Sequence, residues 1–446
     1  MLDLKTPIII GRGPADAKKY GHRGCILLGK KYQDTDVYKS ELSNPVFMDV
    51  SGAHVVSIFG KRGGGKSYTM GVIAEGFSLL EEKVKKNLSV ILLDTMGIYW
   101  TMSHPNETDR KLLEEYDLMP RSVKSRIFTP IKYHAEYKKK GIPTDYPFSI
   151  NPAELDTDDW LVTFKQDKHS PIGVLIEDAI SKLQSIKQKY TLQEIVKEIR
   201  DNKDFSHDSK MEAVSMFEVA DRWGVFGDIS TDLNFLAAPG EITVLDVSCY
   251  ATEPGGWDIK TMVVGLVSKH LFVSRMLKRK QEEYDQLKES TSFFHDGHNV
   301  DIKKKEHNDM PLVWLVIDEA HEFLPRKEED ANAATEPLKI IMREGRQPGI
   351  SLIIATQQPG KIHTDVMTQS DMVLSHRITA NIDTEALSLL AQSYNRDGLI
   401  SAMEELPRIK GTAVAFDDAN EQIHKIRVRP RISWHGGGSP NALTML

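Results

Sequence analysis

The chain has 446 residues, of which 40% are hydrophobic and 27% charged, a composition that fits a globular protein with two or three average domains or one large α/β core with insertions. Two cysteines, Cys25 and Cys249, exclude a disulfide framework and indicate a reducing compartment. The formal net charge of -7 does not indicate nucleic-acid binding, yet a channel lined with Lys and Arg can lie inside an acidic shell.

Neither a membrane span nor a secretion signal is expected. No stretch of about 18 apolar residues occurs, and the longest candidate, 261–277, is interrupted by Lys269, His270 and Arg275. The N-terminus lacks the basic, then apolar, then small-residue pattern of a signal peptide. We therefore expect the protein to work in the cytoplasm.

Residues 1–50 are expected to form a short β-segment. Apolar runs at 8–10, 25–28 and 46–48 are separated by Gly and Lys. These strands either form a small subdomain or add edge strands to the core.

From residue 51 strands and helices alternate, which predicts a mostly parallel sheet covered by helices. The strands expected to be buried are short, rich in β-branched residues and flanked by turn or polar residues. They are 55–59, 89–94, 242–247, 313–318, 351–355 and 371–376. The predicted core therefore comprises 51–100 and 239–425, with 426–446 as a C-terminal tail.

A glycine-rich segment follows the first of these strands directly. Residues 60–67 match the G-x-x-x-x-G-K-[ST] pattern of a P-loop, which predicts that the chain binds a nucleoside triphosphate. Backbone N–H groups surround the phosphates, Lys66 supplies a cation to the β- and γ-phosphates, and the Ser67 hydroxyl can ligate Mg²⁺. A helix starting near Tyr68 points its positive end at the same anion. The predicted binding residues are Gly60, Lys61, Arg62, Gly63, Gly64, Gly65, Lys66, Ser67 and Tyr68.

Two insertions interrupt the alternation. Residues 101–238 are expected to be mostly helical, with a capping box at Thr191 to Glu194 and with Trp160 and Trp223 anchoring a small core.

The second insertion, residues 279–310, is dense in charge and includes three consecutive lysines. We expect a solvated loop, and the alternative is a basic loop that touches a polyanion. His295, His298 and His307 lie within it, but the segment offers too little fixed geometry for a metal site.

An apolar run at 312–317 leads into Asp318 and Glu319. Asp318 can hold Mg²⁺, and Glu319 is placed to orient and deprotonate the attacking water as a general base. Because adjacent strand residues face opposite ways, the strand must end here for both acids to reach one site. The alternative is a pair of acids that cap the following helix.

Three residues further along are candidates for the same site. Arg343 and Arg346 close a helix that begins near Glu336, and an Arg from a neighbouring subunit can stabilise transition-state charge at the γ-phosphate. The alternative is that the pair complements the helix C-terminus. Gln357 follows the strand at 351–355, where an amide can contact the γ-phosphate or the lytic water.

Together these motifs resemble the HerA/FtsK superfamily of hexameric DNA-translocating ATPases, and HerA-like proteins most closely. The resemblance covers roughly 45–105 and 240–437. The motifs that carry it are Pro-Val-Phe-Met-Asp at 45–49, the strand and P-loop at 54–67, Leu-Leu-Asp-Thr-Met-Gly-Ile-Tyr at 92–99, Asp-Glu-Ala-His-Glu-Phe-Leu at 318–324, Arg-Glu-Gly-Arg at 343–346, Ile-Ala-Thr-Gln-Gln-Pro at 354–359 and Val-Arg-Pro-Arg-Ile-Ser-Trp-His-Gly-Gly at 428–437.

The chain departs from the family in two places. HerA proteins usually have Glu where this chain has Ile98, so any role of that acid is lost. The family's N-terminal β-barrel needs more residues than precede the core here, so the barrel is truncated or absent and docking through it is in doubt. Residues 318–321 also spell the signature of DEAH helicases, but those proteins carry it much closer to the P-loop.

The resemblance implies a RecA-like core of the P-loop NTPase (ASCE) type that uses ATP and Mg²⁺. It implies a homo-hexamer that translocates or unwinds double-stranded DNA, in DNA end processing or repair with a NurA-type or other nuclease. ATP would lie between subunits, with the P-loop, Asp318, Glu319 and Gln357 from one and Arg343 or Arg346 from the next.

Two alternatives stay open. The same motor can pump DNA in conjugation or virion packaging. The other alternative is a nucleotide-gated scaffold in a defence or assembly complex, against which the intact Lys66, Glu319 and Gln357 argue.

Overall fold

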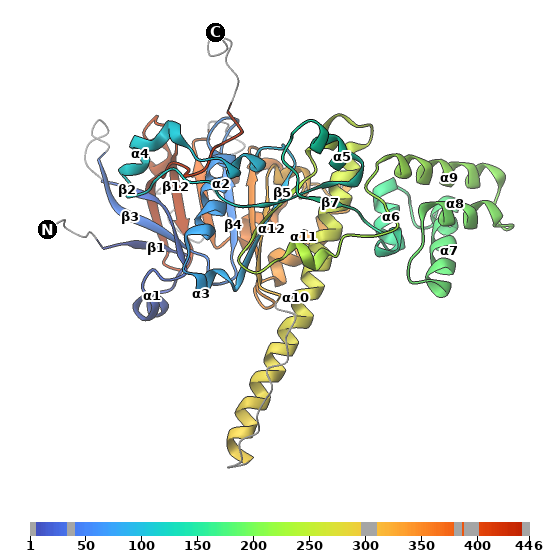
Figure 1. Cartoon of the computed structure of the whole chain (residues 1–446), viewed down its shortest axis with the longest axis horizontal. Helices are drawn as coiled ribbons and strands as arrows, with labels where there is room; N and C mark the ends of the chain where they lie inside the picture. The colour runs from blue at the N-terminus through green and yellow to red at the C-terminus, as the bar shows by residue number, and fades with distance from the viewer. Residues whose placement is uncertain (1–5, 34–40, 296–309, 379–385, 388–400, 439–446) are drawn as a thin grey trace, which may run out of the picture.

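A computed structural model describes residues 6–33, 41–295, 310–378, 386–387 and 401–438. In these residues thirteen strands form one sheet, in the order β1-β3-β2-β13-β12-β11-β4-β10-β9-β5-β8-β6-β7 (Figure 1). The strands are β1 (Ile8–Ile10), β2 (Cys25–Tyr32), β3 (Leu42–Asp49), β4 (Val55–Phe59), β5 (Leu88–Asp94), β6 (Arg126–Pro130), β7 (Tyr146–Phe148), β8 (Ile242–Asp246), β9 (Leu312–Ile317), β10 (Ile350–Thr356), β11 (Met372–His376), β12 (Thr412–Asp417) and β13 (Gln422–Val428).

The eight strands from β11 to β7 in this order are all parallel. Thr356 of β10 lies opposite Phe59 of β4, and Ile354 lies opposite Ile317 of β9, so the carboxyl ends of these three strands meet at one edge of the sheet. All six strands expected to be buried are present, and the predicted α/β class with a mainly parallel central sheet is confirmed.

The N-terminal strands extend this sheet. β2 pairs antiparallel with β13, where Ile426 lies opposite Lys31, and β3 and β1 follow at the edge. Of the two options left open for residues 1–50, the edge strands are therefore the one observed. The tail boundary expected at 426 is wrong, because it falls inside β13, whose alternating exposed and buried residues mark a strand with one solvated face.

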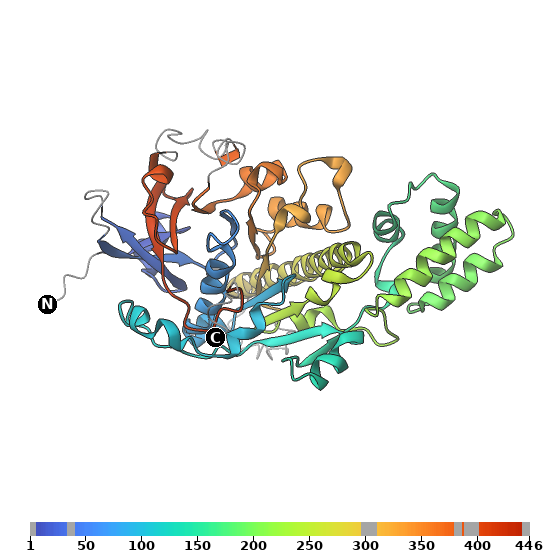
Figure 2. The same cartoon turned by 90° about the horizontal axis from the view of Figure 1, so that it is seen from above.

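Helices cover both faces of the sheet (Figure 2). Helix α2 packs on one face with Val56 and Ile353, whereas α10, α11 and α12 pack on the other with Leu352 and Ile354, as the alternation of strand side chains requires. The helices are α1 (Pro14–Tyr20), α2 (Lys66–Gly76), α3 (Glu82–Lys85), α4 (Arg110–Glu114), α5 (Ile131–Lys139), α6 (Thr157–Phe164), α7 (Pro171–Ile186), α8 (Leu192–Asp201), α9 (His207–Arg222), α10 (Gly256–His295), α11 (Thr335–Glu344) and α12 (Thr364–Gln369).

The insertion contains α4 to α9, and α7 to α9 lie at the end of the molecule farthest from β1 (Figure 1). The capping box between Thr191 and Glu194 opens α8 as predicted. Trp160 stacks with Phe226 and contacts Phe217, and this cluster continues into the core on the α10 face. The insertion also adds β6 and β7 to the sheet, which the expectation of a mostly helical segment did not include.

Helix α10 is 40 residues long and projects beyond the sheet (Figure 1). The expected loop at 279–310 is therefore wrong for its first part, which is helix as far as His295. Pairs three and four residues apart support this helix, such as Arg279 with Glu282 and with Glu283 at 3.5 and 3.2 Å. The three lysines at 303–305, and His298 and His307, lie outside the described residues.

In the described part of the chain, none of the helices combines the length and apolar character that crossing a membrane requires. The same residues contain no group of three or more His, Cys, Asp or Glu arranged to hold a metal ion.

Candidate active site

The glycine-rich loop connects β4 to α2 at the edge where the parallel strands end. Gly63 and Gly65 have φ values of +71° and +105°, a region that side chains disfavour. At Gly64 an added Cβ would lie 2.9 Å from the carbonyl oxygen of Lys61. Glycine is therefore required at these positions for the loop to take this compact shape.

Lys66 begins α2 and is only 6% exposed. Its Nζ lies 3.5 Å from the carbonyl oxygen of Lys61, so the ammonium group folds back over the loop. The first turn of α2 directs its backbone N–H groups to the same place, since N-terminal N–H groups have no partner inside a helix. The loop, the helix end and Lys66 thus form a positively polarised cradle for phosphate groups.

A hydrogen bond joins this cradle to the acidic motif after β9. The Ser67 hydroxyl donates to Oδ2 of Asp318 at 2.5 Å, although 251 residues separate the two in sequence. Asp318 is 3% exposed, and its Oδ1 accepts the backbone N–H of Glu319 at 2.8 Å. A hydroxyl and a carboxylate oxygen side by side are hard oxygen ligands, the donor set that suits Mg²⁺.

At Glu319 the backbone leaves the extended conformation of β9. Its φ of +51° and ψ of 43° are left-handed, so the backbone turns immediately after Asp318 and both acids stay near the P-loop. Burial and the neighbouring Asp318 raise the pKa of Glu319, and Lys66 opposes this shift. Oε2 of Glu319 is buried and accepts no hydrogen bond from any described residue.

The tip of β10 lies between the P-loop strand and the acidic strand. Gln357 follows Thr356 there and is half-buried, in the place expected for it, and its contact with phosphate or water stays a prediction. Nε2 of the adjacent Gln358 lies 3.4 Å from Nε2 of His321, a residue that was not among the predicted site residues. The signal that could have placed His321 near this site is its position at the end of the Asp-Glu-Ala-His sequence at 318–321.

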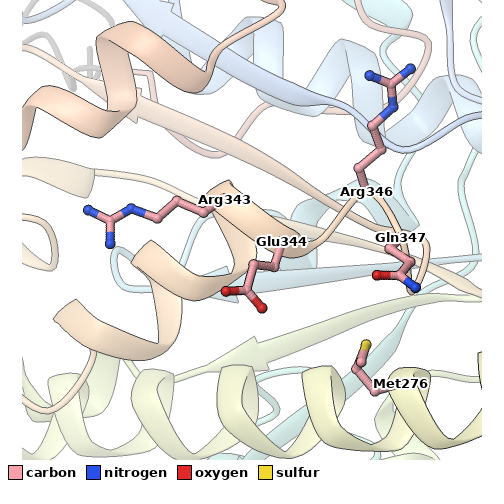
Figure 3. A pocket seen from close by; sticks show the side chains of 5 residues that line it. All are labelled: Met276, Arg343, Glu344, Arg346 and Gln347. Atoms are coloured by element: carbon pink, nitrogen blue, oxygen red, sulfur yellow. The ribbon is translucent and has the colours of Figure 1, made fainter.

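The two arginines do not meet the P-loop of their own chain. Arg346 is exposed and precedes β10, at the sheet edge opposite the P-loop. Arg343 forms an ion pair with Asp365, with 2.6 Å between Nε and Oδ2. Figure 3 shows the two guanidinium groups pointing in different directions beside an open hollow of about 500 Å³ that Met276 and Gln347 also line.

A buried histidine, His376, packs against the P-loop, and no local sequence pattern predicted this contact. Nδ1 of His376 lies 2.9 Å from the carbonyl oxygen of Thr412 and Nε2 lies 2.8 Å from the hydroxyl of Thr69. His376 packs against Gly60 and Gly65: a Cβ added at Gly60 would lie 2.8 Å from Cβ of His376, and one added at Gly65 would lie 3.5 Å from Cε1 of the ring. Burial lowers the pKa of His376 to about 4, so the ring is neutral.

Residues 429–435, which we call the strap, bind to α2 through hydrogen bonds to Glu75. Arg429 Nη1 donates to Glu75 Oε1 at 2.6 Å, and the Ser433 hydroxyl donates to Glu75 Oε2 at 2.6 Å. Arg429, Arg431 and Glu75 are completely buried. Tyr68, the last predicted nucleotide-binding residue, accepts the backbone N–H of Arg431 at 2.7 Å.

The second motif strand, β5, ends in a turn that Asp94 holds. Its carboxylate accepts the backbone N–H groups of Met96, Gly97, Ile98 and Tyr99 at 2.7 to 3.1 Å. These hydrogen bonds use only the backbone of residues 96–99. The turn therefore forms although Ile98 stands where the family usually has an acid.

Comparison with known proteins identifies related sequences. Residues 37–271, just over half of the chain, match the family described as the central domain of the helicase HerA. The probable DNA double-strand break repair helicase HerA of Methanocaldococcus jannaschii is 24% identical over 362 residues, 75% of this chain and 64% of that protein. The DNA double-strand break repair helicase HerA of Pyrococcus furiosus is 26% identical over 209 residues, 46% of this chain and 36% of that protein. The chain thus spans less than two thirds of the length of these relatives.

Two solved structures are similar in fold. VirB4 of Thermoanaerobacter pseudethanolicus aligns with a TM-score of 0.54 and 13% identity, covering 99% of this chain and 100% of that one. The bacterial conjugative coupling protein TrwBΔN70, in its unbound monoclinic form, aligns with a TM-score of 0.50 and 11% identity, covering 93% and 95%. At these identities the likeness concerns the fold alone.

Proposed function

Since the chain belongs to the family of the HerA central domain, within the HerA/FtsK superfamily, we propose that it is an ATPase that translocates or unwinds double-stranded DNA as a homo-hexamer. The observation that carries this proposal is the convergence of Lys66, Ser67, Asp318 and Glu319 at one edge of the sheet. Phosphate cradle, metal ligands and general base are then within one site, as ATP hydrolysis requires.

Each residue would have a separate task. The N–H groups of the loop and Lys66 would hold the β- and γ-phosphates of ATP, and Ser67 and Asp318 would hold Mg²⁺. A metal ion held there would supply positive charge that offsets the negative charge of the phosphates. Glu319 would accept the proton of the attacking water, a role that its raised pKa favours by making the carboxylate a stronger base.

The site would be completed by a neighbouring subunit. Arg346 lies at the opposite edge of the sheet from its own P-loop, which supports a contact with the P-loop of another subunit in a ring. We assign it the role of stabilising the γ-phosphate in trans, with Arg343 bracing the same surface through Asp365.

The proposed process is the handling of DNA ends in repair, with a NurA-type or other nuclease as partner. The names of the two curated relatives support the repair assignment for those proteins. The fold likeness to VirB4 and TrwB does not decide between repair and conjugation-type or packaging motors.

ATP hydrolysis measured with and without linear duplex DNA at low salt tests the proposal. We expect DNA to raise the rate several-fold and Lys66→Ala to abolish ATP binding and hydrolysis under both conditions, because it removes the cation of the cradle. A rate that DNA leaves unchanged would favour the nucleotide-gated scaffold. Unchanged ATP affinity in Lys66→Ala would remove the P-loop assignment.

A further inference from the structure

His321 lies between the general base and the tip of β10. Its Nδ1 is 3.1 Å from the hydroxyl oxygen of Thr356 and 3.6 Å from Oε2 of Glu319. Its Nε2 is 3.4 Å from Nε2 of Gln358 and 3.3 Å from Oε1 of Glu322. The imidazole thus contacts both the strand that ends in the acids and the strand that ends in Gln357.

Burial of His321 favours a neutral ring. Burial lowers its pKa, as do Lys361 and Lys66, whereas Glu322 and Asp318 raise it. A neutral imidazole carries one N–H, so only one ring nitrogen can donate.

The burial of the two neighbouring carboxylates, Glu319 and Glu322, indicates which ring nitrogen of His321 carries the proton. Glu322 is 47% exposed, so water can satisfy its oxygens. Oε2 of Glu319 is buried and no described residue donates to it, and a buried carboxylate oxygen without a donor is costly. Nδ1 of His321 lies 3.6 Å from this oxygen. An amide N–H of Gln358 can donate to Nε2, which is consistent with the proton on Nδ1.

We propose that His321 is a positioning residue for ATP hydrolysis. When nucleotide binding moves the tip of β10, the Nδ1–H group of His321 stops donating its hydrogen bond to Thr356 and donates it to Glu319 instead. This new hydrogen bond holds the carboxylate of the general base in position. The inference rests on the proposed ATPase function. Thr356 Oγ1 also accepts the backbone N–H of Gln358 at 3.0 Å, so a movement of the β10 tip toward bound phosphate would move the acceptor that now competes for His321. His321 does not touch the substrate in this account; it acts through Glu319.

Two substitutions of similar size separate this role from simple packing. In His321→Asn the amide nitrogen can take the place of Nδ1, whereas in His321→Gln it takes the place of Nε2. We expect Asn to retain kcat within a few-fold of the parent. Gln should lower kcat roughly 10- to 100-fold, the effect of losing one hydrogen bond to a charged group, with the Kd for ATP unchanged.

The readouts are steady-state kcat, KM and the Kd for ATP, and Glu322→Gln serves as the control that should leave kcat unchanged. Equal kcat values for Asn and Gln, or a loss that appears only in ATP affinity, would overturn the positioning role. So would a variant pattern in which Gln is active and Asn is not, since Nε2 would then be the donor. If Glu319→Gln abolishes hydrolysis while both His321 variants match the parent, the proposed function stands and only this inference fails.

Discussion

Lys66 and Glu319 occupy the same site but are held in different ways. Lys66 is buried against its own loop, with a carbonyl oxygen near its ammonium group. Glu319 is turned toward the site by a left-handed backbone and lies beside a second carboxylate. A change at Lys66 should therefore act on ATP binding, whereas a change at Glu319 should act on the chemical step.

Glu319→Gln tests this separation. The amide has the shape of the carboxylate but cannot accept the water proton, so turnover should fall by about 10²–10⁴ with ATP binding retained. Binding is measured with a fluorescent ATP analogue and turnover by phosphate release. A variant that hydrolyses ATP near the parent rate would remove Glu319 from the mechanism.

His376 should make stability depend on pH. Its pKa of about 4 lies below the value near 6.5 of an unfolded histidine, so the unfolded chain takes up a proton first as the pH falls. The contribution of the neutral ring to the free energy of unfolding is complete when the pH is above the pKa of the unfolded state. It is lost as the pH falls toward the pKa of the folded state, and about 2 kcal/mol is lost between pH 7 and pH 5.

Urea unfolding at the two pH values provides the measurement, with His376→Gln as the variant that cannot titrate there. The free energy of unfolding of the variant should fall by about 2 kcal/mol less than that of the parent over this interval. Parallel losses in the two proteins would show that His376 is not responsible.

The residues of the site that sequence could predict are those with local spacing. The glycines, Lys66 and Ser67 stand together after one strand, and Asp318 and Glu319 after another, so their chemistry is readable from short motifs. His376 could not be found this way, because its partners Thr69 and Thr412 lie 307 and 36 residues away. His321 is next to the acids, but its contact with Thr356 exists only because β9 and β10 pair.

At the scale of elements, α11 and the turn after it present a surface far from the P-loop of the same chain. α11 runs back along the sheet, so Arg346 emerges at the amino end of β10. This geometry is what a contribution of Arg346 in trans needs.

Mixed rings test the trans contact. Arg346→Ala and Lys66→Ala homo-oligomers should each be inactive, but a mixture contains interfaces with an intact P-loop facing an intact Arg346, and these should regain part of the ATPase activity. The same mixture made with Arg343→Ala distinguishes the two arginines. If mixed rings demonstrably form and none is active, Arg346 does not act in trans or one dead subunit stops the ring.

Strands could be predicted from the sequence where they are continuous apolar runs in the centre of the sheet. Strands at the margins of the sheet were harder to predict. β4, β5, β9 and β10 are short apolar runs buried on both faces, which identifies them directly. β6 contains Arg126 and Pro130 although it is buried throughout, so its composition does not mark it as a strand.

At the scale of the whole molecule, the proposed motor would hold DNA through its backbone. A protein that tracks along a duplex contacts mainly phosphates, and each neutralised phosphate releases a counterion. DNA affinity should therefore fall steeply and linearly on a log–log plot against salt, and should differ little between unrelated duplex sequences. Fluorescence anisotropy gives both quantities, and a salt-independent affinity would argue against phosphate tracking.

The strap carries a consequence for how the protein is made. Glu75 in α2 depends on Arg429, Ile432 and Ser433, more than 350 residues later in synthesis, and β4 lies between β10 and β11, which also emerge late. A ribosome adding about 5–20 residues per second would expose the P-loop tens of seconds before its supports exist. A chain synthesised only as far as α11 would thus lack a formed ATP site, and ATP turnover would have to wait until Ser433 has been added.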